Sequence, residues 1–553
     1  MDISDNKLKN ILVKGNYLDE ELDEVDKVLE EGGQSLQEYL LTNDLITGDI
    51  LGQALAEEYG LDYFDLNSNP TTSEKVHRIP QDIAQHFNIV VVKEGKDKVR
   101  IATSNPEKED LKSRIKKGFS DKEIELVYSL ENDIRDSFVH YQKKLDTRFA
   151  EIIENKDRVA PEILNEIFVD AQAFEASDIH FEPRDEDVLV RFRIDGVLQE
   201  AGVLPKKYYK NILNRIKVMS NLRIDEHFIA QDGSMHYKTD NDSFDVRTSI
   251  VPTVTGEKTV LRMLSSYIGG LSLANIGLSE RNQKLLTKAA KQPFGMILVT
   301  GPTGSGKTTT LYSLIHLLEQ PKVNITTIED PVEYKIEKAN QIQVDKENNL
   351  TFSEGLRSIV RQDPDIILVG EIRDEETARI SVNAALTGHL LLSTFHSNDA
   401  ATAIPRLLDM GIESFLLSST LELLVAQRLV RKICENCRHS VTKKVSELEK
   451  TQKGVGSFFN EKEVTLYEGE GCNVCNGTGF DGRTAVFEII EMTTEMQELV
   501  LEDPSTSEVW KLARKQGVQS MFEDGIEKVK EGVTTLEEVS RVIPLDDVRK
   551  DKK

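Results

Sequence analysis

A glycine-rich stretch at residues 294–312 constrains the fold of this chain more than any other feature. The apolar run 296–299 predicts a buried strand, and residues 309–318 predict a helix. Between them lies the Gly-x-x-x-x-Gly-Lys-Thr pattern of a phosphate-binding loop. Its residues are Gly301, Pro302, Thr303, Gly304, Ser305, Gly306, Lys307, Thr308 and Thr309. Because strand, loop and helix follow in the required order, the sequence favours a nucleotide site over an ordinary glycine-rich turn.

The residue types of this loop suit a nucleoside triphosphate. Glycines let several backbone N–H groups turn toward phosphate oxygens, and the start of the following helix adds partial positive charge. We expect Lys307 to reach the β- and γ-phosphates and Thr308 to supply a Mg²⁺ ligand. The sequence therefore predicts binding of a nucleoside triphosphate together with Mg²⁺.

Length and charge restrict the class of protein further. A chain of 553 residues exceeds one hydrophobic core, so roughly three to five domains are expected. The formal net charge of −26 argues against a broad surface for nucleic acid. No run approaches the roughly 18 apolar residues of a membrane span, and the N-terminus lacks a signal peptide's basic start. We expect a cytoplasmic protein of mixed α/β class.

Changes of pattern along the chain predict its domains. Strands are expected at 89–92 and 99–102, a helix at 106–117, and a hairpin turn at Asp195-Gly196. The predicted segments are a helical module at 1–66, a small α/β module at 67–145, a linker at 146–159, a second α/β domain at 160–266, a hinge at 267–275, a nucleotide-binding domain at 276–431, a cysteine-bearing insertion at 432–480 and a helical C-terminal region at 481–553.

Acidic residues follow two predicted strands of the nucleotide-binding domain. The strand 323–328 leads into Glu329-Asp330-Pro-Val-Glu333, and the strand 365–370 leads into Glu371-Ile-Arg-Asp374. Strand ends of this kind lie beside the phosphate loop in parallel sheets, where Mg²⁺ and the attacking water are managed. Solvated charge at the strand ends is the alternative.

Two histidines bracket a further predicted strand at 389–393. His389 begins it and His396 follows it, so either side chain is a candidate to face the γ-phosphate. A purely structural role is equally compatible with the sequence.

Four cysteines form two Cys-x-x-Cys pairs. Each pair offers two thiolates to one tetrahedral ion, so the two pairs complete a four-thiolate shell for a structural Zn²⁺. The ligands are Cys434, Cys437, Cys472 and Cys475. Redox-active pairs are the alternative.

Taken together, these blocks resemble the type II secretion and type IV pilus assembly ATPases. Residues 327–333, 361–374 and 387–396 are similar to the family's Asp box, Walker B element and His box. Residues 176–183 and 191–196 are similar to its second N-terminal domain. The resemblance implies a RecA-like core preceded by a PAS-like domain. It also implies a cytoplasmic homohexamer that hydrolyses ATP, docked through a cytoplasmic partner on an inner-membrane platform protein, and drives pilin or pseudopilin assembly.

The resemblance also implies roles for individual residues. Glu333 would activate the attacking water, and Glu371 would act on Mg²⁺ through water. Arg247 and Arg262 would reach the phosphates from the preceding domain. This suits phosphoryl transfer, which needs extra positive charge near the γ-phosphate oxygens. The supporting residues are Asp330, Arg357, Arg361, His389 and His396. The alternative for Arg247 and Arg262 is that they are alternating strand residues that face solvent and have no catalytic role.

The first helical module resembles a domain that binds cyclic di-GMP in some relatives. The leucines of that pattern are present as Leu36, Leu40, Leu51 and Leu55. The arginine, glycine and glutamine positions read Ser35, Gln37, Asp44 and Glu58. The helical scaffold is kept without the cation and glycines that a cyclic dinucleotide needs, so we expect no binding.

Three other functions compete with the assembly motor. A pilus-retraction motor is disfavoured by the N-terminal module and the cysteine insertion, which retraction motors of this family lack. A nucleic-acid-translocating ATPase is disfavoured by the acidic charge and by the lack of interleaved aromatic and basic residues. A nucleotide-gated scaffold without catalysis is disfavoured by the presence of Lys307, Thr308, Glu333 and Glu371.

Overall fold

The computed structural model divides into two compact units. The first holds residues 1–144 with the short loop 472–477, and the second holds residues 145–471 and 478–553. The described residues are 5–15, 17, 36, 40, 46–66, 68–69, 71–108, 110–119, 122–141, 160–238, 243–264, 272–273, 275–319, 322–345, 348–472 and 474–543. The predicted linker at 146–159, most of the predicted hinge, and Ser35, Gln37 and Asp44 lie outside them.

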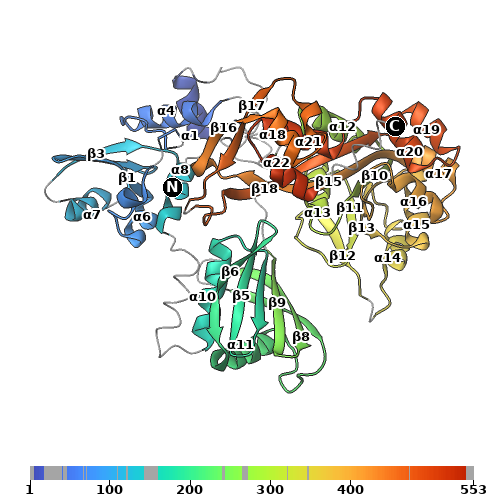
Figure 1. The fold of residues 1–553 in the computed structure, drawn as a ribbon, viewed down its shortest axis with the longest axis horizontal. Coiled ribbons are helices and arrows are strands. Elements are labelled where there is room, and N and C mark those ends of the chain that lie inside the picture. The colour runs from blue at the N-terminus through green and yellow to red at the C-terminus, as the bar shows by residue number, and fades with distance from the viewer. Residues whose placement is uncertain are drawn as a thin grey trace. The chain divides into compact units, whose positions relative to one another are not determined.

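The first unit begins with helices and continues as a small α/β module (Figure 1). The predicted leucines are buried in one core between its helices, with Leu36, Leu40 and Leu51 fully covered. The strands have the order β1-β2-β3, with an antiparallel first pair and a parallel second pair. Its elements are α1 Asp5–Lys14, α4 Gly48–Glu58, α5 Ser73–Val76, α6 Gln81–Phe87, β1 Ile89–Glu94, β2 Lys98–Thr103, α7 Leu111–Gly118, β3 Glu123–Tyr128, α8 Glu131–Ser137 and η1 Phe138–Tyr141.

The second unit opens with a six-stranded antiparallel sheet of order β6-β5-β4-β9-β8-β7. Side chains alternate along β4: Ile179 and Phe181 join the core under α10 and α11, whereas His180 belongs to the opposite, polar face. The predicted turn at Asp195-Gly196 joins β5 to β6 with φ of 49° and 78°. The elements are α10 Ala160–Ala173, β4 Asp178–Pro183, β5 Asp187–Ile194, β6 Val197–Pro205, α11 Lys206–Met219, β7 Gln231–Lys238, β8 Ser243–Thr253 and β9 Gly256–Leu264.

A seven-stranded sheet of order β12-β11-β13-β14-β10-β15-β18 forms the nucleotide-binding domain. Its strands run parallel except β18. Hydrophobic cores lie on both faces of the sheet, which agrees with the complete burial of β10. Helices α12 and α13 contribute to one core, and α14 to α17 contribute to the other. The elements are α12 Glu280–Ala290, β10 Gly295–Thr300, α13 Lys307–Leu318, β11 Ile325–Glu329, β12 Ala339–Gln343, α14 Phe352–Ile359, β13 Ile366–Ile372, α15 Glu375–Leu386, β14 Leu390–Phe395, α16 Ala403–Asp409, α17 Ser414–Thr420 and β15 Leu421–Ile433.

The remaining residues form a small insertion and the C-terminal part. The sequence pattern did not predict β18, which lies where a helical region was expected and extends the main sheet beside β15. The insertion is a two-stranded ribbon with short helices. The elements are η2 Glu435–Cys437, β16 Arg438–Lys444, α18 Val445–Thr451, η3 Val455–Phe458, β17 Glu463–Gly469, β18 Phe480–Glu491, α19 Thr494–Val500, α20 Thr506–Lys515, α21 Met521–Lys530 and α22 Leu536–Val542.

Candidate functional site

The phosphate loop connects the carboxyl end of β10 to α13. Gly301, Gly304 and Gly306 take φ values of 145°, 77° and 86°, a region that other residues rarely adopt. The Lys307 Nζ donates to the carbonyl oxygens of Gly301 and Pro302 at 2.9 and 3.0 Å. Burial lowers the pKa of Lys307. A partly desolvated cation beside a loop of N–H groups gains from an anionic partner, so the loop fits a phosphate chain.

The other loop residues differ in exposure. Pro302, Thr303 and Gly304 are exposed, while Thr308 and Thr309 are half-buried in the first turn of α13. This position agrees with the expected Mg²⁺ ligand role of Thr308, which stays a prediction.

Glu371 lies inside β13 rather than after it, near the same edge of the sheet. Its Oε2 forms an ion pair with the Arg373 Nε at 2.6 Å and lies 3.1 Å from the His396 Nε2. The charge of Glu371 favours the ammonium form of Lys307. The structure therefore gathers Glu371, His396 and Lys307, and adds Arg373, which the sequence analysis did not select although it lies two residues from Glu371.

His389 lies at the other edge of the sheet. It precedes β14, whose first residue Leu390 pairs with Gly295 at the amino end of β10. Its Nδ1 is 2.8 Å from the carbonyl oxygen of Ala384. Because parallel strands bring like ends together, His389 and the phosphate loop are separated by the length of β10, and of the two histidines only His396 lies at the loop's edge.

Glu333 lies opposite an arginine of the six-stranded sheet. The Nη1 and Nη2 atoms of Arg247 lie 3.4 and 3.5 Å from the two carboxylate oxygens of Glu333. Arg262 is directly across from Arg247 in the β8–β9 ladder. Its Nε instead donates to the Oδ1 of Asp178 at 2.9 Å. Both expected arginines therefore share one sheet face, but only Arg247 meets an expected catalytic residue.

Glu329, the last residue of β11, supports the segment that carries Glu333. It is 3% exposed and accepts hydrogen bonds from Tyr312 on α13 at 2.5 Å and from Thr327 at 2.6 Å. Burial raises the pKa of Glu329, and these two donors oppose the rise. The sequence analysis treated Glu329 only as the start of an acidic motif; its position at a strand end, within a buried run, was the available signal.

The supporting residues Asp330, Arg357 and Arg361 are exposed. The Nη2 of Arg357 donates to Glu376 on α15 at 2.5 Å, and the Nη1 of Arg361 donates to the Arg357 carbonyl oxygen at 2.8 Å. These contacts keep both arginines along α14 and its end. No hydrogen bond or ion pair with Glu371 is recorded for either arginine among the described residues.

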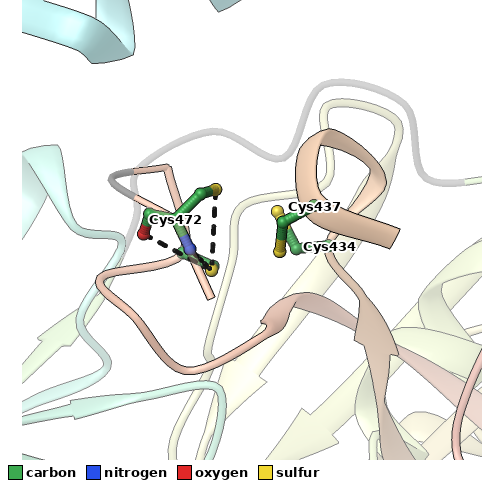
Figure 2. Close-up of side chains that lie close together, drawn as sticks. Cys434, Cys437 and Cys472 are labelled. Carbon is green, nitrogen blue, oxygen red and sulfur yellow. Dashed lines mark hydrogen bonds between the residues drawn. The ribbon is translucent and has the colours of Figure 1, made fainter. Parts of the chain in front are cut away.

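The four cysteines lie together in the insertion (Figure 2). Their sulfur atoms all fall within 4.8 Å of one another, and no disulfide joins them. The Sγ atoms of Cys472 and Cys475 are 3.8 Å apart, and the backbone N–H of Cys472 donates to the Cys475 sulfur. Tetrahedral Zn–S bonds of about 2.3 Å place sulfurs about 3.8 Å apart, so the donor set fits zinc.

Secondary structure explains how sequence-distant cysteines meet. Cys434 directly follows β15, and its N–H donates to the carbonyl oxygen of Gly479 at 3.0 Å, just before β18. Cys434 and Cys475 are buried, whereas Cys437 and Cys472 are half-buried. With four thiols around one point, no ligand position is left for substrate, which favours a structural site.

A parallel sheet with a phosphate loop and acids at its carboxyl edge defines a P-loop ATPase core, and comparison with known proteins identifies its kind. A family described as "Type II/IV secretion system protein" matches residues 154–541, and the MshEN domain matches residues 59–148. The chain belongs to the type II/IV secretion system protein family. The RecA-like core with a preceding α/β domain, expected from the sequence, is confirmed.

Three relatives show how much of the chain is shared. The type IV pilus assembly ATPase PilB of Myxococcus xanthus is 36% identical over 566 residues, covering 96% of this chain and 98% of that protein. The type II secretion system protein E of Pseudomonas aeruginosa is 45% identical over 380 residues, covering 69% and 74%. PilB of Thermus thermophilus is 34% identical over 529 residues and 92% of this chain, which spans 59% of that relative's length.

Among solved structures, the X-ray structure of the Legionella pneumophila ATPase DotB has a similar fold. Its TM-score is 0.52 at 21% identity, and the match covers 70% of this chain and 96% of DotB. At this identity the likeness concerns the fold alone.

Proposed function

We propose that this chain is a motor ATPase that drives pilin or pseudopilin assembly at an inner-membrane platform, in type IV pilus assembly or type II secretion. The match to PilB of Myxococcus xanthus, which spans 96% of the chain, carries this proposal. The grouping of Lys307, Glu371 and His396 at one sheet edge supports ATP hydrolysis.

The proposed chemistry is transfer of the γ-phosphoryl group of ATP to water. Lys307 and the loop N–H groups hold the phosphates, and Glu333 accepts the proton of the attacking water. Thr308 and Glu371 are the residues that would hold Mg²⁺, which neutralises phosphate charge when bound. Arg247 leaves Glu333 for the developing negative charge, which links hydrolysis to movement between domains.

The cysteine cluster has a structural role in this proposal. Cys434, Cys437, Cys472 and Cys475 would hold one Zn²⁺, which ties the insertion to the ends of β15 and β18. Redox chemistry is not needed for the motor.

We further propose a cytoplasmic homohexamer that reaches the inner membrane through partners, a platform protein and a cytoplasmic docking protein. None of the helices in the described part of the chain has the length and apolar character to cross a membrane. Nucleic acid and cyclic di-GMP are not expected ligands.

Two measurements test the proposal. Purified protein should release phosphate from ATP only with Mg²⁺, and single-stranded DNA should not stimulate it; DNA stimulation would favour a nucleic-acid motor. In cells, loss of the gene should remove surface pili or the secreted proteins. Excess pili after gene loss would instead indicate a retraction motor.

A further inference from the structure

The phosphate loop is held from one side by β15, the strand next to β10. Gln427, in the middle of β15, is 1% exposed. Its Nε2 donates to the carbonyl oxygen of Ser305 at 2.7 Å, and its Oε1 accepts from the Thr310 Oγ1 at 2.8 Å. One side chain thus connects β15 to both the loop and the helix that follows it.

We propose that Gln427 is a positioning residue that orients the Ser305–Gly306 peptide toward the nucleotide phosphates, an inference that rests on the proposed ATP binding. A trans peptide is planar, so its C=O and N–H point in opposite directions. When Gln427 holds the Ser305 carbonyl, the N–H of Gly306 turns away from β15. The N–H groups of such a loop are the ones that bind phosphate oxygens.

The first and last glycines of the loop, Gly301 and Gly306, both lie close to Gln427. A Cβ atom added to Gly301 would lie 2.7 Å from the Gln427 carbonyl oxygen, and one added to Gly306 would lie 3.1 Å from its Nε2. The first distance is a clash and the second is tighter than ordinary contact. Glycine at these positions therefore lets β15 approach the loop closely, in addition to allowing a positive φ.

The two hydrogen bonds of Gln427 can be broken separately. Gln427→Glu keeps an acceptor for Thr310 but removes the donor to Ser305. Thr310→Val removes only the bond at the other end of the amide. Gln427→Met keeps the length of the side chain, removes both bonds and adds no buried charge, so it serves if the glutamate variant does not fold.

The test measures ATP turnover against ATP concentration for the full chain. We expect Gln427→Glu and Gln427→Met to raise KM for ATP about ten-fold or more, the cost of one misaligned charge-assisted hydrogen bond. The kcat at saturating ATP should change less than about three-fold, since the water-activating groups are untouched. Thr310→Val should raise KM less than about three-fold, because the Ser305 carbonyl stays held.

A second buried glutamine provides the matched control. Gln231 is 9% exposed, and both ends of its amide are bonded, to Arg223 and Glu226 in the six-stranded-sheet domain. Gln231→Met should lower the unfolding temperature as Gln427→Met does, while leaving KM for ATP within about two-fold.

The inference is overturned if folded Gln427→Met has the wild-type KM, or if Thr310→Val and Gln427→Glu raise KM equally. In both cases the proposed function would still hold, provided that the wild-type chain itself hydrolyses ATP. If the wild-type chain does not turn over ATP at all, the proposed function fails and the inference fails with it.

Discussion

The two large sheets of the second unit present their candidate chemistry in different ways. The parallel sheet carries it at the carboxyl ends of β10, β11 and β13, where loops place Lys307 and Glu333. The antiparallel sheet has its candidate residues within two neighbouring strands, where Arg247 of β8 and Arg262 of β9 lie directly opposite each other. A phosphate loop at a strand end can be recognised from its local sequence, whereas the role of an arginine within a strand depends on which residues it contacts in the folded protein.

The largest effect is expected at the parallel sheet. Lys307→Ala should lower ATP turnover about 100-fold or more, because the loop still forms but the phosphate charge loses its partner. Phosphate release by the purified full chain measures this.

Lys284→Ala is the control for this substitution, since Lys284 is an exposed lysine of α12 that pairs with Glu280. It should retain wild-type turnover. Near-normal turnover in Lys307→Ala would mean that the sheet edge is not the nucleotide site.

The cysteine cluster at the end of β15 is expected to hold a zinc ion that contributes to the stability of the fold. Protein purified without added metal should contain one Zn²⁺ per chain, and Cys472→Ser should contain none and unfold roughly 5 °C or more lower, because a structural zinc contributes folding energy. Elemental analysis and thermal unfolding measure the two quantities.

Ser457→Ala, in the same insertion, should keep both the metal and the unfolding temperature. A metal-free preparation of the wild-type chain with full activity would rule out the zinc site.

The two arginines of the antiparallel sheet sharpen the comparison, because they share one face but have different partners. Arg247→Ala should reduce turnover about ten-fold, since it removes the guanidinium that contacts Glu333. Arg262→Ala should reduce it less, about three-fold, because Asp178 holds its guanidinium. Steady-state turnover of the two variants under identical conditions gives the ratio. An equal loss, or a larger loss for Arg262→Ala, would contradict the pairing observed here.

The smallest effect is expected in the first unit, where calorimetric titration of the full chain with cyclic di-GMP should give no micromolar binding. Burial in a helical core is enough to explain its leucines, and the described Glu58 is an exposed acid that would repel a dianion. Titration of the same sample with ATP is the positive control. A clear micromolar isotherm for cyclic di-GMP would show that other residues form such a site.

Much of the parallel sheet could be predicted, because β10, β13 and β14 contain short apolar runs and, like β11, lead into recognisable motifs. The strand β18 could not, since its place depends on pairing with β15 from far along the chain. The same limit applies to the site. The sequence places His389 before and His396 after one predicted strand, but only the parallel pairing of β14 with β10 shows that His396 lies at the edge with the phosphate loop.

The contact between Arg247 and Glu333 could not be predicted from the sequence either, because the two residues are 86 positions apart, one in β8 of the six-stranded sheet and the other in the loop after β11. Resemblance to a family suggested a role for each residue separately. The structure adds that the two side chains contact each other. The carboxylate of Glu333 therefore links the candidate residues of the six-stranded sheet to those of the nucleotide-binding domain.

Single-turnover phosphate release by Glu333→Gln tests this account most directly, with Glu337→Gln, an exposed neighbour, as the matched control. We predict that Glu333→Gln binds ATP within about three-fold of wild type but releases phosphate about 100-fold more slowly, because the amide cannot accept the proton of water. Glu337→Gln should behave as wild type in both measurements. Normal phosphate release by Glu333→Gln would contradict the assignment of Glu333, the residue that Arg247 contacts, as the catalytic base.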